Sequence, residues 1–67
     1  MYQERSVLPD GVVFELEFLN EKNYRLACLK GGRLLVEYLG GGGYEFKSVE
    51  KLRYDFERDA EDALRQD

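Results

Sequence analysis

The sequence lacks histidine, threonine and tryptophan, and its 67 residues include one cysteine and one proline. Without histidine, neither Cys28 nor Ser48 has the base that commonly activates a thiol or hydroxyl nucleophile. Cys28 is therefore expected in the core, and Ser48 is expected to cap a helix. The composition predicts a protein that is not an enzyme, and we assign it no catalytic residue, cofactor or metal site.

A single cysteine also excludes an internal disulfide, the usual stabiliser of small secreted domains. The longest apolar run has four residues, at 26–29, and runs of three lie at 12–14 and 34–36, whereas a membrane-spanning helix needs about 20. The first ten residues lack the long apolar stretch of a signal peptide. The sequence therefore predicts a cytoplasmic protein with no membrane contact.

The length fits one small domain over residues 1–67, and 43% hydrophobic with 36% charged residues is typical of a folded chain. The segment 8–11, Leu-Pro-Asp-Gly, favours a turn, because proline fixes its own φ and glycine accepts a positive φ. This turn separates an N-terminal arm, residues 1–11, from an antiparallel sheet over residues 12–47. Hydrophobic and polar residues alternate there with the period of half-buried strands. The alternation predicts strands at 12–19, 24–29 and 33–39, and a short fourth strand at 44–46.

Two groups of glycines divide this sheet. Gly31 and Gly32 suit a two-residue hairpin, in which both central residues adopt a positive φ. Residues 40–43 are four consecutive glycines, but the Lys-Ser/Thr pair that completes a phosphate-binding loop is absent after them. We therefore expect the second group to be a flexible connection.

Residues 48–66 change to the period of a helix. One face carries the apolar residues Val49, Leu52, Phe56, Ala60 and Ala63, spaced three or four apart. The other faces are charged, with opposite charges four residues apart. The pattern predicts a C-terminal helix over 49–65 that begins after Ser48.

These elements predict an α+β domain, in which a small antiparallel three- to four-stranded sheet carries one C-terminal helix on its apolar side. The side chains that share the apolar faces form the expected core: Phe14, Leu16, Phe18, Leu26, Cys28, Leu34, Val36, Phe46, Leu52 and Phe56.

The opposite side of the predicted sheet is not fully polar. It carries the apolar residues Val13, Leu19, Ala27, Leu29, Leu35 and Leu39 among its charged ones. Either the sheet curls into a small SH3-like barrel that buries some of them, or a second chain covers them. We expect a non-enzymatic protein–protein interaction domain, such as an inhibitor, adaptor or small subunit, whose partner is another protein or a second copy in a homodimer. The expected contacts are Arg25, Leu29, Arg33, Leu35, Leu39 and, on the far side of the helix, Tyr54.

The charge distribution supplies an alternative function. The formal net charge is −4, but residues 22–33 carry four basic residues and no acidic one. An SH3-like nucleic-acid-binding module would use this hairpin, with the contacts Lys22, Tyr24, Arg25, Lys30 and Arg33. The acidic helix would repel the same polyanion, which argues against nucleic acid as the partner.

Residues 34–58 run LLVEYLGGGGYEFKSVEKLRYDFER. The order is an apolar strand that ends near an aromatic residue, a glycine-bearing loop, a short aromatic strand and a helix that contains leucine. This order resembles the second half of a chromo- or Tudor-type module of the SH3-like barrel class. That family binds methylated lysine or arginine in a cage of aromatic side chains. The resemblance implies a small barrel, with cage positions at Tyr38, Tyr44 and Phe46.

Overall fold

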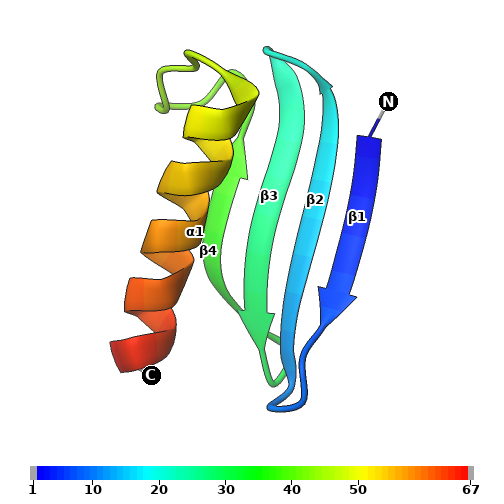
Figure 1. Cartoon of the computed structure of the whole chain (residues 1–67), viewed down its shortest axis with the longest axis vertical. Coiled ribbons are helices and arrows are strands. Elements are labelled where there is room, and N and C mark those ends of the chain that lie inside the picture. Colours follow the sequence, from blue (N-terminus) through cyan, green and yellow to red (C-terminus); the bar gives the residue numbers. More distant parts are fainter. Residues whose placement is uncertain (1, 67) are drawn as a thin grey trace.

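The computed structural model describes residues 2–66 and shows an antiparallel sheet with a helix packed on one of its faces (Figure 1). The elements are β1 Tyr2–Val7, β2 Val12–Asn20, β3 Asn23–Lys30, β4 Arg33–Leu39 and α1 Val49–Gln66. Each strand is hydrogen-bonded to the next in the order β1-β2-β3-β4. The predicted α+β class and C-terminal helix are confirmed. Because β1 and β4 lie at opposite edges, the sheet is open and does not close into a barrel.

The tight turns at one end of the sheet depend on glycine. Gly31 and Gly32 have φ of 59° and 81°, which fits the predicted two-residue hairpin between β3 and β4. Gly11, with φ of 77°, ends the turn between β1 and β2. The amide of Gly31 donates to the carbonyl of Gly11 at 3.2 Å, so the two turns lie side by side (Figure 1).

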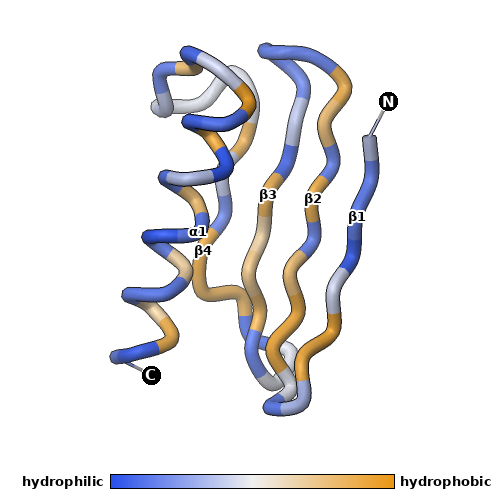
Figure 2. The backbone as a smooth tube through the Cα atoms, in the orientation of Figure 1, coloured by the Kyte–Doolittle hydropathy of each residue, from blue (hydrophilic) through white to orange (hydrophobic). Residues whose placement is uncertain are grey.

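The N-terminus, rather than residues 44–46, supplies the fourth strand. Residues 2–7, which the sequence placed in an arm outside the sheet, pair with β2 along their whole length as β1. Residues 44–46 belong instead to an irregular loop before α1. Figure 2 shows that β1 is hydrophilic over most of its length. It therefore lacks the apolar alternation by which a strand is recognised in a sequence.

The core lies between α1 and the side of the sheet that faces it. The buried members of this core are Val12, Leu16, Tyr24, Leu26, Cys28, Leu52, Phe56 and Ala60. Partly buried side chains pack around them, namely Phe14, Phe18, Val36, Tyr38, Tyr44, Phe46 and Leu64. Phe56 is fully buried and meets the rings of Phe14 and Tyr38 edge-on, at 6.1 and 5.7 Å between centroids. Every expected core residue except Leu34 belongs to these two groups.

A β-bulge in β4 explains why the prediction for Leu34 is wrong. Cys28 pairs with Val36, whereas Leu29 pairs with Leu34, so Leu35 is an extra residue in the ladder. The extra residue shifts the alternation of side chains along β4. Leu34 consequently shares a side with Leu29, away from the core, and is 45% exposed.

Hydrogen bonds fix the start of α1 and the loop before it. Ser48 caps the helix as predicted, because its Oγ accepts a hydrogen bond from the amide of Lys51 at 3.1 Å. One turn later, the buried carboxylate of Asp55 accepts hydrogen bonds from the Tyr44 hydroxyl at 2.7 Å and from Lys51 Nζ at 3.0 Å. These bonds, that of Tyr44 first, hold the pKa of Asp55 below its usual value of 3.8. Burial and the same bond raise the pKa of Tyr44 to about 12.

Candidate interaction surfaces

The side of the sheet away from α1, which we call the outer face, carries a row of alternating charges. Arg5, Glu15, Ala27 and Glu37 are in register across the four strands. Arg25, one row further along β3, reaches over Ala27 and binds both glutamates. The charges therefore read plus, minus, plus, minus from β1 to β4.

Three ion pairs connect this charge row. Arg5 Nε lies 3.5 Å from Glu15 Oε2, and Arg25 Nη1 lies 3.2 Å from Glu15 Oε1. Arg25 Nε donates to Glu37 Oε2 at 2.7 Å. The bonds to Glu37 and then Glu15 raise the pKa of Arg25, so the guanidinium stays charged. Each pair is partly exposed and contributes about 1 kcal/mol or less. The charge row therefore adds little to the stability of the fold, and its main effect is to give the outer face a fixed order of charges.

A row of apolar residues lies beside the charge row, at the end of the sheet that carries the glycine turns. Val7, Val13, Leu29 and Leu34 are in register across all four strands. Val7 is 62% exposed and Leu34 is 45% exposed at the two edges, while Val13 and Leu29 between them are half-buried. We call these four residues the apolar row. A hydrophobic strip that runs from edge to edge of an uncovered sheet is typical of an interaction surface.

The residues predicted to bind a partner do not form one surface. Arg25, Leu29 and Leu39 lie on the outer face, and Leu39 is 50% exposed at the edge strand. Leu35 is the extra residue of the bulge, and it is half-buried. Arg33 pairs with Lys30, which puts it on the side of the ladder that faces α1. The bulge is the reason that the expected alternation fails in this part of β4.

Tyr54, the second predicted contact, is on the other side of the molecule. Its ring is 61% exposed on α1, and the sheet lies beyond the helix. Lys51 Nζ and Arg58 Cζ lie 6.0 and 5.8 Å from the ring centroid, within cation–π distance. Tyr54 therefore belongs to the charged outer surface of the helix.

The residues of the alternative nucleic-acid site are separated in space. Lys22 lies in the turn before β3, whereas Lys30 and Arg33 lie at the turn after it, about 23 Å away along an eight-residue strand. Tyr24 is buried, and its ring stacks on Phe18 at 5.9 Å between centroids. A buried tyrosine presents no face on which a base could stack. The structure therefore does not bring this set together.

The three positions assigned to an aromatic cage are divided between two ring clusters. Tyr38 and Tyr44 are neighbours, with 5.1 Å between ring centroids, and their hydroxyls donate to Asp59 and Asp55 of α1. Phe46 packs instead against Phe18 and Tyr24, at 5.9 and 6.1 Å between centroids. Both clusters are packed against the hydrophobic core.

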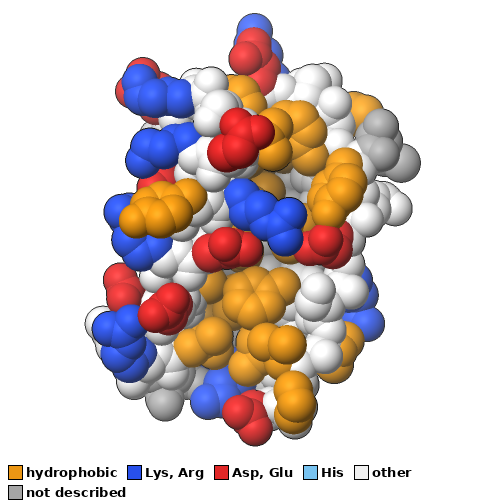
Figure 3. All heavy atoms as spheres, viewed as in Figure 1, with side chains coloured by type: hydrophobic (Ala, Val, Ile, Leu, Met, Phe, Trp, Pro, Cys, Tyr) orange, Lys and Arg blue, Asp and Glu red, His pale blue; other side chains and the backbone are white. Residues whose placement is uncertain are grey.

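A groove on the helix side of the sheet was not predicted from the sequence. α1 contacts β3 and β4, and it leaves the neighbouring part of β1 and β2 open beside it (Figure 1). The resulting groove has a volume of about 510 Å³. Figure 3 shows hydrophobic side chains gathered on this face of the molecule, with both acidic and basic side chains around them. The residues that line the groove are Glu4, Ser6, Leu8, Phe14, Leu16, Arg53, Phe56, Glu57, Glu61 and Leu64.

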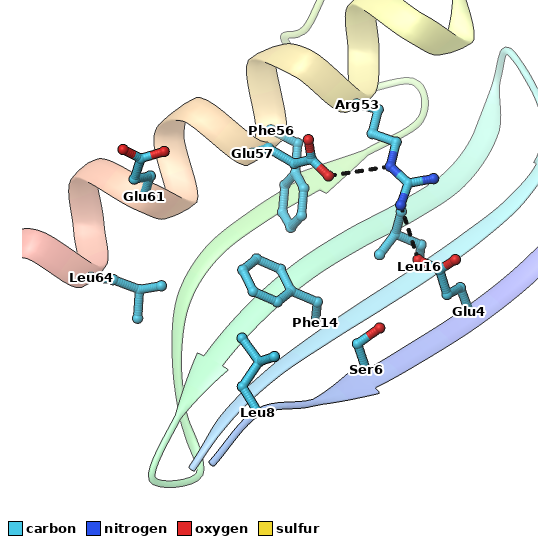
Figure 4. Close-up of a pocket in the computed structure, with 10 residues that line it drawn as sticks. All are labelled: Glu4, Ser6, Leu8, Phe14, Leu16, Arg53, Phe56, Glu57, Glu61 and Leu64. Atoms are coloured by element: carbon cyan, nitrogen blue, oxygen red, sulfur yellow. Dashed lines mark hydrogen bonds and ion pairs between the residues drawn. The ribbon is translucent and has the colours of Figure 1, made fainter. Parts of the chain in front are cut away.

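Arg53 crosses the groove from α1 to the edge strand (Figure 4). Its Nη2 donates to Glu4 Oε1 of β1 at 3.1 Å, and its Nε donates to Glu57 Oε2 of α1 at 3.2 Å. The Tyr2 hydroxyl donates to the other oxygen of Glu4 at 2.6 Å. The bond to Glu57 contributes most to the raised pKa of Arg53. These bonds connect α1 to a strand that the core does not otherwise join to it.

One signal in the sequence could have indicated the helix wall of this groove. Arg53, Glu57, Glu61 and Leu64 are spaced four, four and three residues apart, so they share one flank of α1. The opposite wall could not be anticipated, because the strand that forms it was expected to be an arm.

The groove and the outer face both present connected apolar side chains. In the part of the chain that the structure describes, no helix combines the length and the apolar character needed to cross a membrane. No family model, curated protein or solved structure matches the chain. A function must therefore be inferred from the two surfaces themselves.

Proposed function

We propose that this protein is a non-enzymatic protein–protein interaction module that binds a second copy of itself through the outer face of its sheet. The observation that carries the proposal is the apolar row, because it exposes hydrophobic side chains from β1 to β4 on a face that α1 does not cover. Burying such a strip against another protein removes apolar surface from water.

The order of charges supports a second copy as the partner. In a symmetric dimer, the same surface of each protomer meets the other. A two-fold axis parallel to the strands would stack β1 of one protomer on β4 of its partner. Arg5 would then face the partner's Glu37, and Glu15 would face the partner's Arg25, so every facing pair has opposite charges. The plus, minus, plus, minus order of the charge row is therefore complementary to itself.

The same axis places the hydrophobic residues of one protomer opposite the hydrophobic residues of the other. Val7 would meet the partner's Leu34, and Val13 would meet the partner's Leu29. Two sheets stacked in this way form an aligned sandwich, in which the strands cross at about 30°. Four strands about 4.8 Å apart and about 25 Å long present about 500 Å² each, or about 1,000 Å² for both protomers. This area is close to the lower end for specific interfaces, so the dimer should be weak and reversible.

Sedimentation equilibrium over about three orders of magnitude in concentration tests the proposal. Leu34→Asp should weaken dimerisation at least about tenfold, because it places a charge in the apolar row. Tyr54→Asp makes the same kind of change on exposed α1 and should leave dimerisation unchanged. A wild-type chain that stays monomeric at the highest concentration contradicts the proposal.

A charge-reversal experiment tests the orientation of the two protomers. Arg5→Glu and Glu37→Arg should each weaken the homodimer, because like charges then face each other twice. An equimolar mixture of the two variants should recover association, since each facing pair again has opposite charges. If the mixture associates no better than either variant alone, the proposed two-fold arrangement is wrong.

A further inference from the structure

The helical layer of this fold covers only half of the sheet. Four strands about 4.8 Å apart make a sheet about 19 Å wide, whereas a helix with its side chains is about 10 Å across. α1 packs on β3 and β4, so about one helix width of the sheet, over β1 and β2, has no helix on it, and the side chain of Arg53 crosses this space to Glu4. The groove of about 510 Å³ lies in this space.

The floor of the groove is hydrophobic. Phe14 and Leu16 rise from β2, and Phe56 and Leu64 reach in from α1 (Figure 4). Leu8, 43% exposed, closes the end of the groove near the glycine turns. Ser6 is the small residue on the β1 side, so the edge strand leaves the floor accessible beside Ser6, whereas Glu4 of the same strand binds Arg53 across the groove.

The rim of the groove is acidic. Glu57 and Glu61 line it from α1, and Glu4 lines it from β1. Arg53 is the basic residue among them, and Glu4 and Glu57 already bind it at 3.1 and 3.2 Å. Arg65 Nη2 also donates to Glu61 Oε1 at 3.0 Å, so the rim has three carboxylates against two guanidinium groups. Lysine or arginine on a ligand would meet the excess of carboxylates over guanidinium groups at this rim.

We propose that the groove binds an amphipathic helix of a partner protein, with an apolar stripe on the floor and lysine or arginine against the rim. The space matches the width of a helix, and a helix-in-groove complex would complete the layer that α1 begins. The α1 helix of a second copy does not fit this chemistry, because it carries six acidic and four basic residues. This inference is independent of the proposed dimer, since the groove and the outer face lie on opposite sides of the sheet.

A synthetic peptide provides a direct probe of the groove. We would use a helix of about 18 residues, built from leucine, lysine and alanine, with leucines at i, i+3, i+4 and i+7. Isothermal titration calorimetry should detect binding of this peptide to the full chain, and circular dichroism should show a gain of helix on binding. A peptide with glutamate in place of lysine should not bind. A peptide of the same composition with strictly alternating leucine and lysine tests a strand at the β1 edge, and its tighter binding would overturn the proposal.

Two pairs of protein variants locate the binding. Ser6→Tyr fills the groove from the edge strand and should weaken binding of the leucine–lysine peptide at least tenfold, whereas Gln3→Tyr on the outer face of the same strand should not. The double variant Glu57→Lys/Glu61→Lys should no longer bind the leucine–lysine peptide and should bind the glutamate peptide instead. Glu50→Lys should behave toward both peptides as the wild-type chain does.

Binding that survives Ser6→Tyr and the double reversal would show that the peptide sits elsewhere, and it would overturn the proposal. Absence of binding to the wild-type chain would overturn it as well. Neither result bears on dimerisation through the outer face. Dimerisation is measured separately, by comparing the sedimentation of the wild-type chain with that of Leu34→Asp.

Discussion

Arg25 bonds to the two glutamates that flank Ala27 in the sheet, at 3.2 Å to Glu15 and 2.7 Å to Glu37. Ala27 is fully buried even though no strand or helix covers it. The guanidinium itself covers the alanine. A small residue at this position is therefore what allows one arginine to join β2 to β4.

Ala27→Leu should destabilise the protein by about 1–3 kcal/mol, because the larger side chain displaces Arg25 from both carboxylates. Urea unfolding measures the change. If displacement of Arg25 is the cause, Ala27→Leu should cost clearly less in an Arg25→Ala background, where no guanidinium is displaced. Strictly additive effects of the two substitutions would contradict this explanation.

Gly40→Ala should destabilise the protein by more than about 1 kcal/mol. A Cβ at this position would lie 2.7 Å from the carbonyl carbon and oxygen of Lys22 and 2.8 Å from the amide nitrogen of Tyr24, so the loop could not stay against β3. Gly43 is the matched control, because a Cβ there meets nothing within 4 Å. Gly43→Ala should be neutral or stabilise by up to about 1 kcal/mol, by restricting the unfolded chain. Equal thermal unfolding midpoints for the two variants would refute the assignment of a close approach at Gly40.

Asp55 should make stability fall in acid. Its pKa is lower in the folded protein than its usual 3.8, because Tyr44 and Lys51 donate to the carboxylate. The contribution is complete above the unfolded value and is lost as the pH falls below about 4 toward the folded value. Asp55→Asn should lower stability at pH 7 and flatten the acid limb of a stability–pH curve from urea unfolding. Asp62→Asn, an exposed change on the same helix, should leave that limb as steep as in the wild type.

Cys28 should react slowly with a thiol reagent such as dithiobis(nitrobenzoate) in the folded protein. The side chain is fully buried, and burial raises the pKa of the thiol, which lowers the fraction of reactive thiolate. Modification should be about a thousandfold slower than in unfolding concentrations of urea, because it requires opening of the core. A Gln66→Cys variant adds an exposed thiol at the end of α1 and should show one fast and one slow phase. Two fast phases would contradict a buried position for Cys28.

The parts of the fold that could be predicted are those with a strong hydrophobic period. The stripe from Leu52 to Ala60 defined α1, and the alternation along 12–19 defined β2. The parts that could not be predicted depend on pairing between strands. Leu34, Leu35 and Val36 are three apolar residues in succession, so the sequence gives no reason to place the bulge at Leu35. The pairing with β3 decides which of them faces the core.

The candidate surfaces show the same dependence on pairing. The exposed outer face was expected, but its row of ion pairs requires the register that brings Arg5, Glu15, Ala27 and Glu37 into line. Lys22 and Arg33 are close in sequence, yet an extended strand carries them to opposite ends of the sheet. The groove depends on the position of α1 across the sheet. That position is defined by the packing of the helix on β3 and β4 and cannot be read from the sequence.

The sheet separates two surfaces with different binding chemistry. If copies associate back to back through the outer face, their two grooves point away from each other on the far sides of the assembly. Such a dimer is bivalent, and it would bridge ligands on two different molecules instead of chelating two sites that lie close together. For targets that are themselves multimeric or densely arrayed, the avidity gained in this way can exceed the affinity of one groove by about a hundredfold or more, without any new contact.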